Sequence, residues 1–460
     1  MVIKKLLFTL FILSIVLSAC GAPANNPTST VSSQNTTQTS NSSKTPLVVF
    51  AAGSLIIPFD HLEKAFEARY PDIDVKSEYH GSIQVIRHVS ELHENIDVVA
   101  TADASLIPML MYAVNNPQTG TPYANWYIAF ATNKLAIAYT ENSKYADEIN
   151  SDNWFDILSR RDIRVGMADP RFDASGYRAL MAFALANEYY RQPKIYSNMF
   201  NGRFANPVTI FTDDDHTTIT VPEIFDSKPE TGLIVRGASI QLLALLESGD
   251  LDYAFEYESV IQQHGLEMIS LPDAVNLGNE AYNPTYRKVV VALDFRRFAT
   301  VKPEFRGEQI GYGITIPSSA SHPKEAVLFI DFLFSPEGKA IMMEDHHPMF
   351  DPPLGDNYAN IPDELQTFCK PIPYYTLGMR RRFNLLDGVF SILGGLILLM
   401  VLLPLASTLL SSSPSQFFQT LGDPEVLDAI GLTFGAAAIA TLIALVGGVP
   451  LAYVLARRVF

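Results

Sequence analysis

The chain has 460 residues, enough for roughly two or three domains, and a formal net charge of −16. That charge argues against nucleic acid or an anionic membrane surface as a partner, since both require a basic field, and a site for an anion must therefore be built locally. Its two cysteines, Cys20 and Cys369, exclude a disulfide framework, and the apolar excess behind the mean hydropathy of +0.13 is concentrated at the two ends.

Residues 1–20 have the features of a bacterial lipoprotein signal peptide. Lys4 and Lys5 precede an apolar run, Leu6–Leu17, that is too short to span a bilayer comfortably. The string L-S-A-C that follows resembles the lipobox, in which the signal is removed and the new N-terminal cysteine is lipidated. We therefore expect lipidation of Cys20 and a domain held on the extracytoplasmic side of the cell membrane, with a plain signal peptide as the alternative.

A polar stretch, residues 21–45, separates this signal from the rest of the chain. It is rich in Ser, Thr, Asn, Gln and Pro. Such a segment cannot bury enough apolar surface to offset the entropy of ordering. It predicts a flexible linker between a lipid anchor and a folded domain.

The first part of the folded domain predicts an α/β arrangement. Strand patterns alternate with residues spaced for a helix, in the order strand, helix, strand, helix, strand. The predicted strands are Pro46–Phe50, Ile73–Glu78 and Ile96–Ala100, and the predicted helices run from Phe59 to Tyr70 and from Val85 to Leu92. Short connections between such elements are typical of a mostly parallel sheet.

Two of the strand-to-helix turns carry a Gly-Ser pair, Gly53-Ser54 and Gly81-Ser82. Glycine permits a tight turn, and serine caps a helix while it offers a hydroxyl. Free N–H groups at the positive end of a helix suit a small anion, and such sheets bind ligands at the carboxyl ends of their strands. Ordinary helix capping and an anion site are both open at this point.

The residues that follow predict further strands and helices. Trp126–Tyr139 is a β-rich run long enough to cross between two lobes. The remaining predicted strands are 163–167, 251–257 and 312–317, and the remaining predicted helices are 152–158, one that ends at Tyr190, 237–248 and 323–334. Residues 192–230 are rich in polar and turn residues and carry no assignment.

Two clusters of titratable residues have ordinary explanations. Asp213–Asp215 with His216 lies in a polar loop and indicates a solvated turn rather than a metal site. His346 and His347 follow a predicted helix end, which is typical of a surface pair. The sequence contains no G-x-S-x-G elbow, Walker A loop or H-E-x-x-H motif, so neither catalysis nor a resident cofactor is expected.

Several strings in consistent order resemble the substrate-binding proteins of molybdate/tungstate ABC transporters, specifically the archaeal-type branch. They are A-A-G-S-L, H-G-S-I-Q-V-I-R-H-V, D-V-V-A-T-A-D-A-S-L-I-P, D-A-S-G-Y-R-A-L-M, L-L-A-L-L-E-S-G-D-L-D-Y-A-F-E-Y-E-S-V and Y-G-I-T-I-P. The resemblance implies a two-lobed periplasmic-binding-protein fold of type II over residues 46–372, which closes on one oxyanion. It also implies two partners, an ABC permease and, through it, an ATPase subunit.

The resemblance implies a ligand set as well. Ser54 and Ser82 would be hydrogen-bond donors from one lobe, and the carboxylates of Asp173 and Glu256 would coordinate the molybdenum or tungsten of the oxyanion. Glu258 competes with Glu256, because F-E-Y-E-S-V offers two carboxylates on one strand face. Molybdenum and tungsten are hard acceptors that oxygen donors can coordinate, whereas sulfate cannot expand in that way, so the same carboxylates would reject sulfate. The sequence does not separate molybdate from tungstate.

Other functions are open at this stage. The same fold could bind sulfate, phosphate or ferric iron, and Tyr282 and Tyr286 would suit iron. A lipoprotein enzyme that uses Ser54 or Asp173 would require turnover rather than retention of a ligand. A membrane transport subunit would have its active part at the C-terminus.

Residues 379–460 resemble the start of the permease subunit from the same transporter class, most specifically in G-V-P-L-A-Y-V-L-A-R-R. Two apolar runs, about 385–410 and 429–456, predict two transmembrane helices, and arginine clusters at 380–382 and 457–458 flank them. The positive-inside rule places both clusters in the cytoplasm, whereas the lipoprotein signal places the binding domain outside. We therefore expect two joined reading frames, the second cut short, with a genuine fusion as the alternative.

Overall fold

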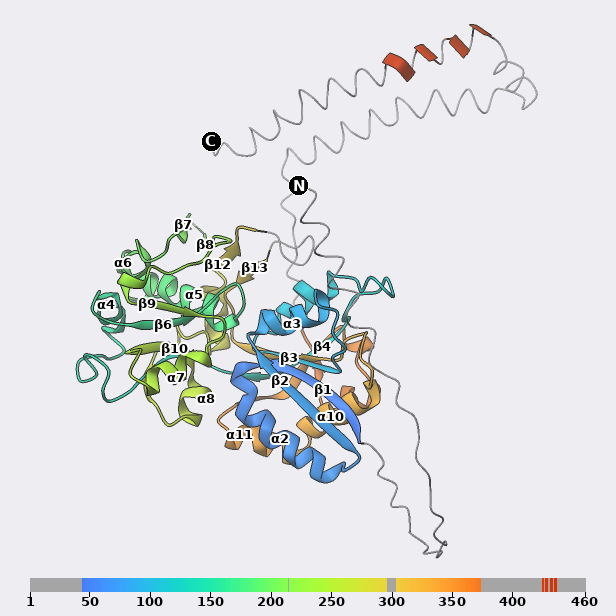
Figure 1. Cartoon of the computed structure of the whole chain (residues 1–460), viewed down its shortest axis with the longest axis horizontal. Helices are drawn as coiled ribbons and strands as arrows, with labels where there is room; N and C mark the ends of the chain where they lie inside the picture. Colours follow the sequence, from blue (N-terminus) through green and yellow to red (C-terminus); the bar gives the residue numbers. More distant parts are fainter. Residues whose placement is uncertain are drawn as a thin grey trace, which may run out of the picture. The chain divides into compact units, whose positions relative to one another are not determined.

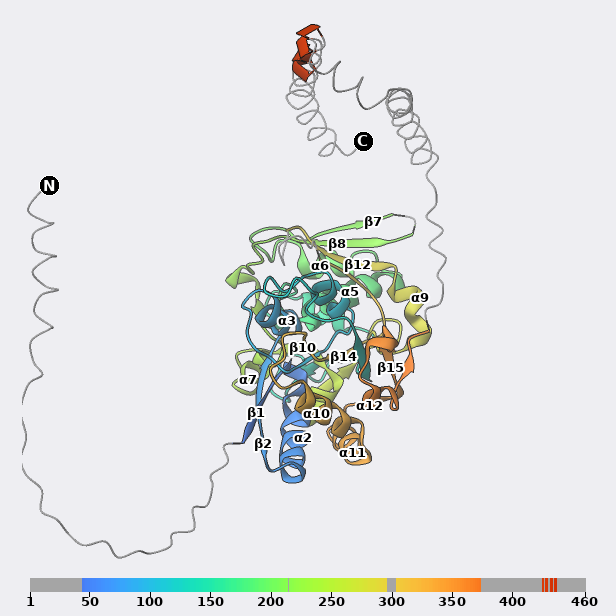
Figure 2. The same cartoon turned by 90° about the vertical axis from the view of Figure 1, so that its right-hand side faces the viewer.

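The computed structural model describes residues 44–213, 215–295 and 303–373 and a few residues between 424 and 436. The described residues up to 372 form one compact unit with three sheets. The first lobe is built on the seven-stranded sheet, and the second lobe is built on the five-stranded and four-stranded sheets (Figures 1 and 2). The predicted α/β architecture in two lobes is confirmed.

The sheet of the first lobe contains the predicted β-α-β-α-β unit. In spatial order its strands are β16 (Lys370–Pro371), β15 (Met349–Asp356), β4 (Tyr127–Thr132), β14 (Gly311–Thr315), β3 (Val98–Thr101), β1 (Thr45–Ala52) and β2 (Ile73–His80). Strand β1 is parallel to both of its neighbours, as predicted. Helices α2 (Ile56–Arg69), α10 (Pro323–Phe334) and α11 (Pro336–Glu344) lie on one side of this sheet, and α3 (Ser82–Ser90) lies on the other (Figure 1).

The second lobe has two sheets with a buried helix between them. The five-stranded sheet has the order β11 (Glu267–Ser270), β5 (Leu135–Tyr139), β10 (Tyr253–Tyr257), β6 (Val165–Ala168) and β9 (Leu233–Arg236). The four-stranded sheet has the order β13 (Glu304–Arg306), β12 (Val289–Leu293), β8 (Thr217–Val221) and β7 (Thr209–Thr212). Helix α5 (Ala174–Tyr189) packs against strands of both sheets and is buried from Ala174 to Ala186. Helices α4 (Trp154–Ser159), α6 (Ile195–Phe200), α7 (Gln241–Glu247), α8 (Glu258–Gln263) and α9 (Asn283–Tyr286) complete this lobe.

The chain crosses between the lobes where the sequence predicted a crossing. Strand β4 belongs to the first sheet and β5 to the second, with Asn133 and Lys134 between them. The chain returns between β13 and β14 through residues 307–310. Short connections of this kind are typical of a hinge between two lobes.

The stretch 192–230, which carried no assignment, contains α6, β7 and β8. Strands β7 and β8 pair antiparallel. Strand β8 also pairs with β12, which lies more than sixty residues later in the sequence. Strand β7 is largely exposed, so the buried apolar pattern that reveals the other strands is absent from it. Pairing with β12, rather than local pattern, completes this part of the second lobe.

The two ends of the chain leave several predictions untested. The signal peptide, Cys20 and residues 21–43 of the linker lie outside the described residues, as does most of the permease-like segment. Among the residues that the structure describes, no helix is both long enough and apolar enough to cross a membrane.

Replacing Phe66 by alanine should destabilise the first lobe by about 3–5 kcal/mol, because it removes a large buried side chain and leaves a cavity. Phe66 is fully buried on α2, and its ring packs edge-on against Phe329 and Phe332 of α10 at centroid distances of 5.3 and 5.7 Å. Urea unfolding followed by circular dichroism would measure the loss. Leu92→Ala, at a position that is 57% exposed, is the matched control and should change the free energy of unfolding little.

Candidate oxyanion-binding site

Each lobe presents the ends of neighbouring parallel strands to the other lobe. In the first lobe, Ser54 follows β1 and Ser82 follows β2. In the second lobe, Glu256 lies at the end of β10, Asp173 follows β6 and Ser239 follows β9, and these three strands are parallel neighbours. Because the carboxyl ends of parallel strands meet at one edge, the topology gathers these side chains, and such edges are where α/β sheets bind ligands.

The two Gly-Ser serines do not cap helices. Ser54 lies in a short 3-10 helix (Gly53–Leu55), and its hydroxyl forms a hydrogen bond with the Tyr312 hydroxyl at 2.9 Å. The N-cap of α3 is Gly81, and the Ser82 hydroxyl accepts a hydrogen bond from the Ala102 N–H at 2.9 Å. Both serines are almost fully buried, and the capping interpretation is wrong because the N-caps of α2 and α3 are Leu55 and Gly81.

The sequence suggested that the amide groups at the start of α3 are free to bind an anion, but two of them already have an acceptor. The N–H groups of Ile83 and Gln84 both donate to the carbonyl oxygen of Phe172, which belongs to the second lobe. The side chain of Gln84 in turn accepts a hydrogen bond from the Gly81 N–H at 3.3 Å. These amides therefore join the lobes instead.

Asp173 is the N-cap of helix α5, and both of its carboxylate oxygens accept backbone hydrogen bonds. Oδ1 accepts one from the Ser175 N–H at 2.8 Å, and Oδ2 accepts one from the Ser239 N–H at 3.2 Å. Burial raises the pKa of Asp173, although the hydrogen bonds from Ser175 and Ser239 and the charge of Arg178 act in the opposite direction. The carboxyl group is therefore held by the first turn of α5 and by the loop that follows β9.

Glu256 is completely buried close to Asp173. Its Oε1 atom accepts a hydrogen bond from the Tyr257 N–H at 2.8 Å, whereas Oε2 has no hydrogen-bond partner. Burial raises the pKa of Glu256 to about 8; the Tyr257 N–H lowers it, the Ser239 side chain, which lies near the carboxyl group but beyond hydrogen-bond distance, also lowers it, and the nearby Asp173 raises it further. A buried carboxyl oxygen without a partner is uncommon. Beside a second carboxylate it is suited to a centre that accepts electron pairs from oxygen.

Glu258 does not share a strand face with Glu256, so that expectation is wrong. Strand β10 ends at Tyr257, and Glu258 is the first residue of α8. It is partly exposed and lines a separate pocket of about 190 Å³ with Lys134 and His346. The turn from strand to helix therefore breaks the alternation that would have placed Glu258 on the same face as Glu256.

Sequence reasoning missed a buried cation next to the site. Arg178, on α5, donates to the Ala102 carbonyl at 2.7 Å and to the Tyr257 hydroxyl at 2.6 Å, and it pairs with Asp103 at 3.3 Å. Its charge also bears on Asp173. The available signal was an arginine inside the otherwise apolar helical run Y-R-A-L-M-A-F-A-L-A.

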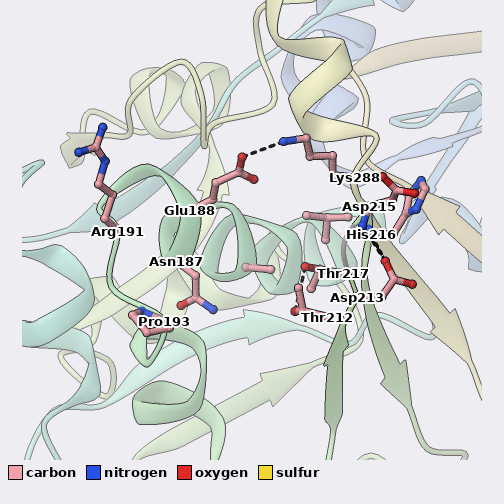
Figure 3. A pocket seen from close by; sticks show the side chains of 12 residues that line it. Asn187, Glu188, Arg191, Pro193, Thr212, Asp213, Asp215, His216, Thr217 and Lys288 are labelled. Carbon is pink, nitrogen blue, oxygen red and sulfur yellow. Dashed lines mark hydrogen bonds and ion pairs between the residues drawn. The ribbon is translucent and has the colours of Figure 1, made fainter.

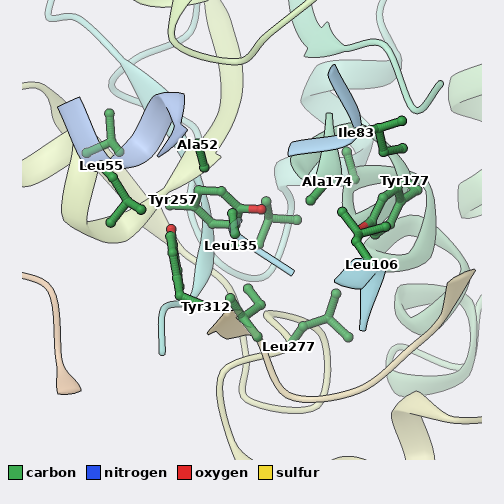
Figure 4. Packing of buried hydrophobic residues seen from close by; sticks show 14 of the residues in the cluster. Ala52, Leu55, Ile83, Leu106, Leu135, Ala174, Tyr177, Tyr257, Leu277 and Tyr312 are labelled. Atoms are coloured by element: carbon green, nitrogen blue, oxygen red, sulfur yellow. The ribbon is translucent and has the colours of Figure 1, made fainter. Parts of the chain in front are cut away.

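Two tyrosines that the sequence did not single out connect the site with the hinge. Tyr257 and Tyr312 approach each other with ring centroids 6.2 Å apart (Figure 4). The Tyr312 hydroxyl also accepts a hydrogen bond from the Asn133 side chain at 3.1 Å. Since Asn133 lies in the crossing between β4 and β5, Ser54 is linked through Tyr312 to that crossing.

His347 is buried and not part of a surface pair, so that prediction is wrong. A positive φ of 59° at His346 turns the chain, so that His346 is exposed while His347 points inward. The His347 ring packs edge-on against Tyr312 at a centroid distance of 5.2 Å, and burial lowers its pKa to about 4. It stays neutral near pH 7 and packs behind a residue of the site.

The acidic cluster near His216 forms a solvated turn, as predicted. Oδ1 of Asp213 accepts hydrogen bonds from the N–H groups of Asp215 at 2.9 Å and His216 at 2.7 Å in the β7–β8 hairpin. These residues line an open pocket of about 550 Å³ with Glu188 and Lys288 (Figure 3). Within the described ranges, no group of three His, Cys, Asp or Glu side chains could hold a metal ion.

Comparison with known proteins identifies the family. Residues 47–346 match bacterial extracellular solute-binding proteins. The chain belongs to this family. It is 37% identical over 324 residues to an uncharacterised solute-binding protein of Petrotoga mobilis, covering 70% of this chain and 90% of the relative. It is also 37% identical over 328 residues to a molybdate/tungstate-binding protein of Pyrococcus abyssi, covering 70% of this chain and 88% of the relative.

A solved structure of the Azotobacter vinelandii periplasmic molybdate-binding protein aligns with 13% identity and a TM-score of 0.41 over 65% of this chain and 98% of its own. The sequence relatives consist of little beyond the matched part. In this chain the described residues up to Ile372 form one compact unit.

Replacing Glu256 by glutamine should stabilise the ligand-free protein at alkaline pH by an amount on the order of 2 kcal/mol. Because the pKa of Glu256 is raised from 4.5 to about 8 in the folded state, its contribution to stability is full below about pH 4.5 and is lost as the pH rises through about 8. A glutamine side chain does not titrate, so the variant does not lose this stability as the pH rises. Urea unfolding near pH 5 and pH 9 would measure the difference, with Glu258→Gln as control, and equal pH slopes in the Glu256→Gln variant and the parent would contradict it.

Proposed function

We propose that this solute-binding protein captures molybdate or tungstate outside the cytoplasm and delivers it to an ABC permease and, through it, to an ATPase subunit. The observation that carries the proposal is the pair of buried carboxyl groups, Asp173 and Glu256, with an oxygen of Glu256 that has no hydrogen-bond partner. The relative from Pyrococcus abyssi, named as a molybdate/tungstate-binding protein, supports the choice of ligand. Ser54 and Ser82, which follow the neighbouring parallel strands β1 and β2 of the first lobe, would donate their hydroxyls to the oxyanion oxygens.

The carboxylates favour the larger oxyanions over sulfate for a chemical reason. A dianion is repelled by an ionised carboxylate, and ionising Glu256, whose pKa is raised to about 8, beside Asp173 costs further free energy unless the charges are paired. Molybdenum and tungsten can accept further oxygen ligands, so each carboxylate oxygen gains a bond to the metal that offsets the repulsion. Sulfur in sulfate does not accept such ligands, and only the repulsion remains.

The alternatives have less support in the geometry. The hydroxyl of Tyr286, one of the two tyrosines suited to ferric iron, is occupied by the Asp273 carbonyl oxygen and the Asn279 N–H. An enzyme that used Ser54 as a nucleophile would need a base on its hydroxyl, and the partner of that hydroxyl is Tyr312. Burial keeps the pKa of Tyr312 well above its usual range, so this hydroxyl stays protonated near pH 7 and is not available as a base.

The attachment to the membrane is part of the proposal. Lipidation of Cys20 would tether the domain to the extracytoplasmic face of the membrane. The permease-like residues 379–460 would be the start of a neighbouring transport subunit whose reading frame has been joined to that of the binding protein, with a genuine fusion as the alternative.

Calorimetric titration of residues 44–372 with molybdate, tungstate, sulfate and phosphate would test the function. We expect tight binding of the first two and weak or absent binding of the others. Asp173→Ala and Glu256→Ala should each weaken binding of molybdate and tungstate by roughly a hundredfold or more, because each removes a ligand of the metal.

Glu258→Ala is the matched control for these variants. It removes a carboxylate of the same type two residues from Glu256, in a different pocket, and should leave the affinity almost unchanged. Tight binding of sulfate or phosphate by the parent, or equal losses from Glu256→Ala and Glu258→Ala, would show that the assignment of the carboxylates is wrong.

A further inference from the structure

The carbonyl oxygen of Phe172, in the second lobe, lies against the N-terminus of helix α3, in the first lobe. It accepts hydrogen bonds from the N–H groups of Ile83 at 3.0 Å and Gln84 at 3.4 Å. The first amides of a helix have no acceptor within it, and the positive end of the helix favours an oxygen at this place. The lobes therefore meet here through backbone atoms, and we call this set of hydrogen bonds the interlobe contact.

Gly81 permits this close approach of the two backbones. A Cβ atom on Gly81 would lie 2.5 Å from the Phe172 carbonyl oxygen and 3.1 Å from the Cβ of Asp173. The φ of −61° and ψ of 143° at Gly81 are open to any residue, so its own conformation does not require glycine. The requirement for glycine therefore comes from the opposite lobe.

The interlobe contact adjoins both halves of the proposed site. Ser82 follows Gly81 directly, and Asp173 follows Phe172 directly. The turn that leads to Asp173 is held by two hydrogen bonds to the Asp169 carbonyl, from the N–H groups of Phe172 at 3.0 Å and Asp173 at 2.9 Å. One peptide bond and a hydrogen-bonded turn therefore fix the Phe172 carbonyl relative to the carboxyl group of Asp173.

A second contact across the same boundary supports this arrangement. The guanidinium carbon of Arg87, also on α3, lies 5.9 Å from the centre of the Phe172 ring. Arg87 itself is held by Glu91 one turn farther along the helix, at 2.7 Å. Both the carbonyl oxygen and the ring of Phe172 therefore contact residues of α3.

We infer that docking of the Phe172 carbonyl on α3 beside Gly81 sets the closed position of Asp173, so that closure of the lobes and coordination of the oxyanion occur together. This inference rests on the proposed function. Gly81 is a positioning residue, because it acts through Phe172 and Asp173 and has no side chain with which to contact the ligand. The hydrogen bonds of the contact exchange with water when the lobes separate, so the contact is reversible.

Replacement of Gly81 by alanine in residues 44–372 tests the inference. The three atoms nearest to the added Cβ all belong to the opposite lobe, so the substitution should hinder closure without disturbing the turn. We expect binding of molybdate and tungstate to weaken by roughly tenfold or more, mainly through faster dissociation, which stopped-flow chase experiments would measure. The melting temperature of the ligand-free variant should stay close to that of the parent.

Two other glycines at the same boundary provide graded controls. A Cβ on Gly237 would lie 3.8 Å from its nearest neighbour, the flexible side chain of Gln84, so Gly237→Ala should bind within about twofold of the parent. A Cβ on Gly53 would lie 3.2 Å from the side chain of Ile240, which can move, so Gly53→Ala should have an intermediate effect. If replacing any glycine weakened binding equally, the three variants would not show this order of affinities.

The outcomes separate the inference from the proposed function. If the parent binds molybdate or tungstate and Gly81→Ala binds and releases it as the parent does, the inference is wrong and the function stands. If the parent binds none of the oxyanions, the function is wrong, and the inference that rests on it is overturned with it.

Discussion

Two carboxyl groups held side by side and away from water dominate the chemistry between the lobes. Glu256 is fully buried and Asp173 is 5% exposed. Two anions in such surroundings are unfavourable. Backbone N–H groups offset part of this cost at Asp173, and protonation offsets part of it at Glu256, whose pKa is raised to about 8. One oxygen of Glu256 has no hydrogen-bond partner among the described residues, so hydrogen bonds offset less of the cost there than at Asp173.

Much of this arrangement was predictable from the sequence, because it follows from topology. Alternating strands and helices predict parallel strands, and the carboxyl ends of parallel strands share an edge. Ser54, Ser82, Asp173 and Glu256 all stand at such ends. The resemblance to a known family indicated which side chains at those ends to choose, and the crossing after Trp126 indicated that there were two lobes to bring them together.

The remainder depends on contacts that no local pattern contains. Ser54 bonds to Tyr312, 258 positions away, and His347 turns inward because of the backbone conformation of the residue before it. Glu258 was misplaced because it begins helix α8, beyond the end of strand β10 at Tyr257. The role of the Gly-Ser turn at Gly81 was also misread, since its glycine leaves room for a backbone carbonyl from the other lobe.

The use of α3 to join the lobes has a consequence for selectivity. The end of a helix can bind an anion of any kind. Here two of its amides bind a neutral carbonyl oxygen instead, and the nearby cation of Arg178 is paired with Asp103. On the proposed function, these two general sources of attraction for an anion are therefore largely occupied when the lobes close. Discrimination then rests on whether the ligand can accept oxygen donors from Asp173 and Glu256, a property that sulfate lacks and molybdate and tungstate share.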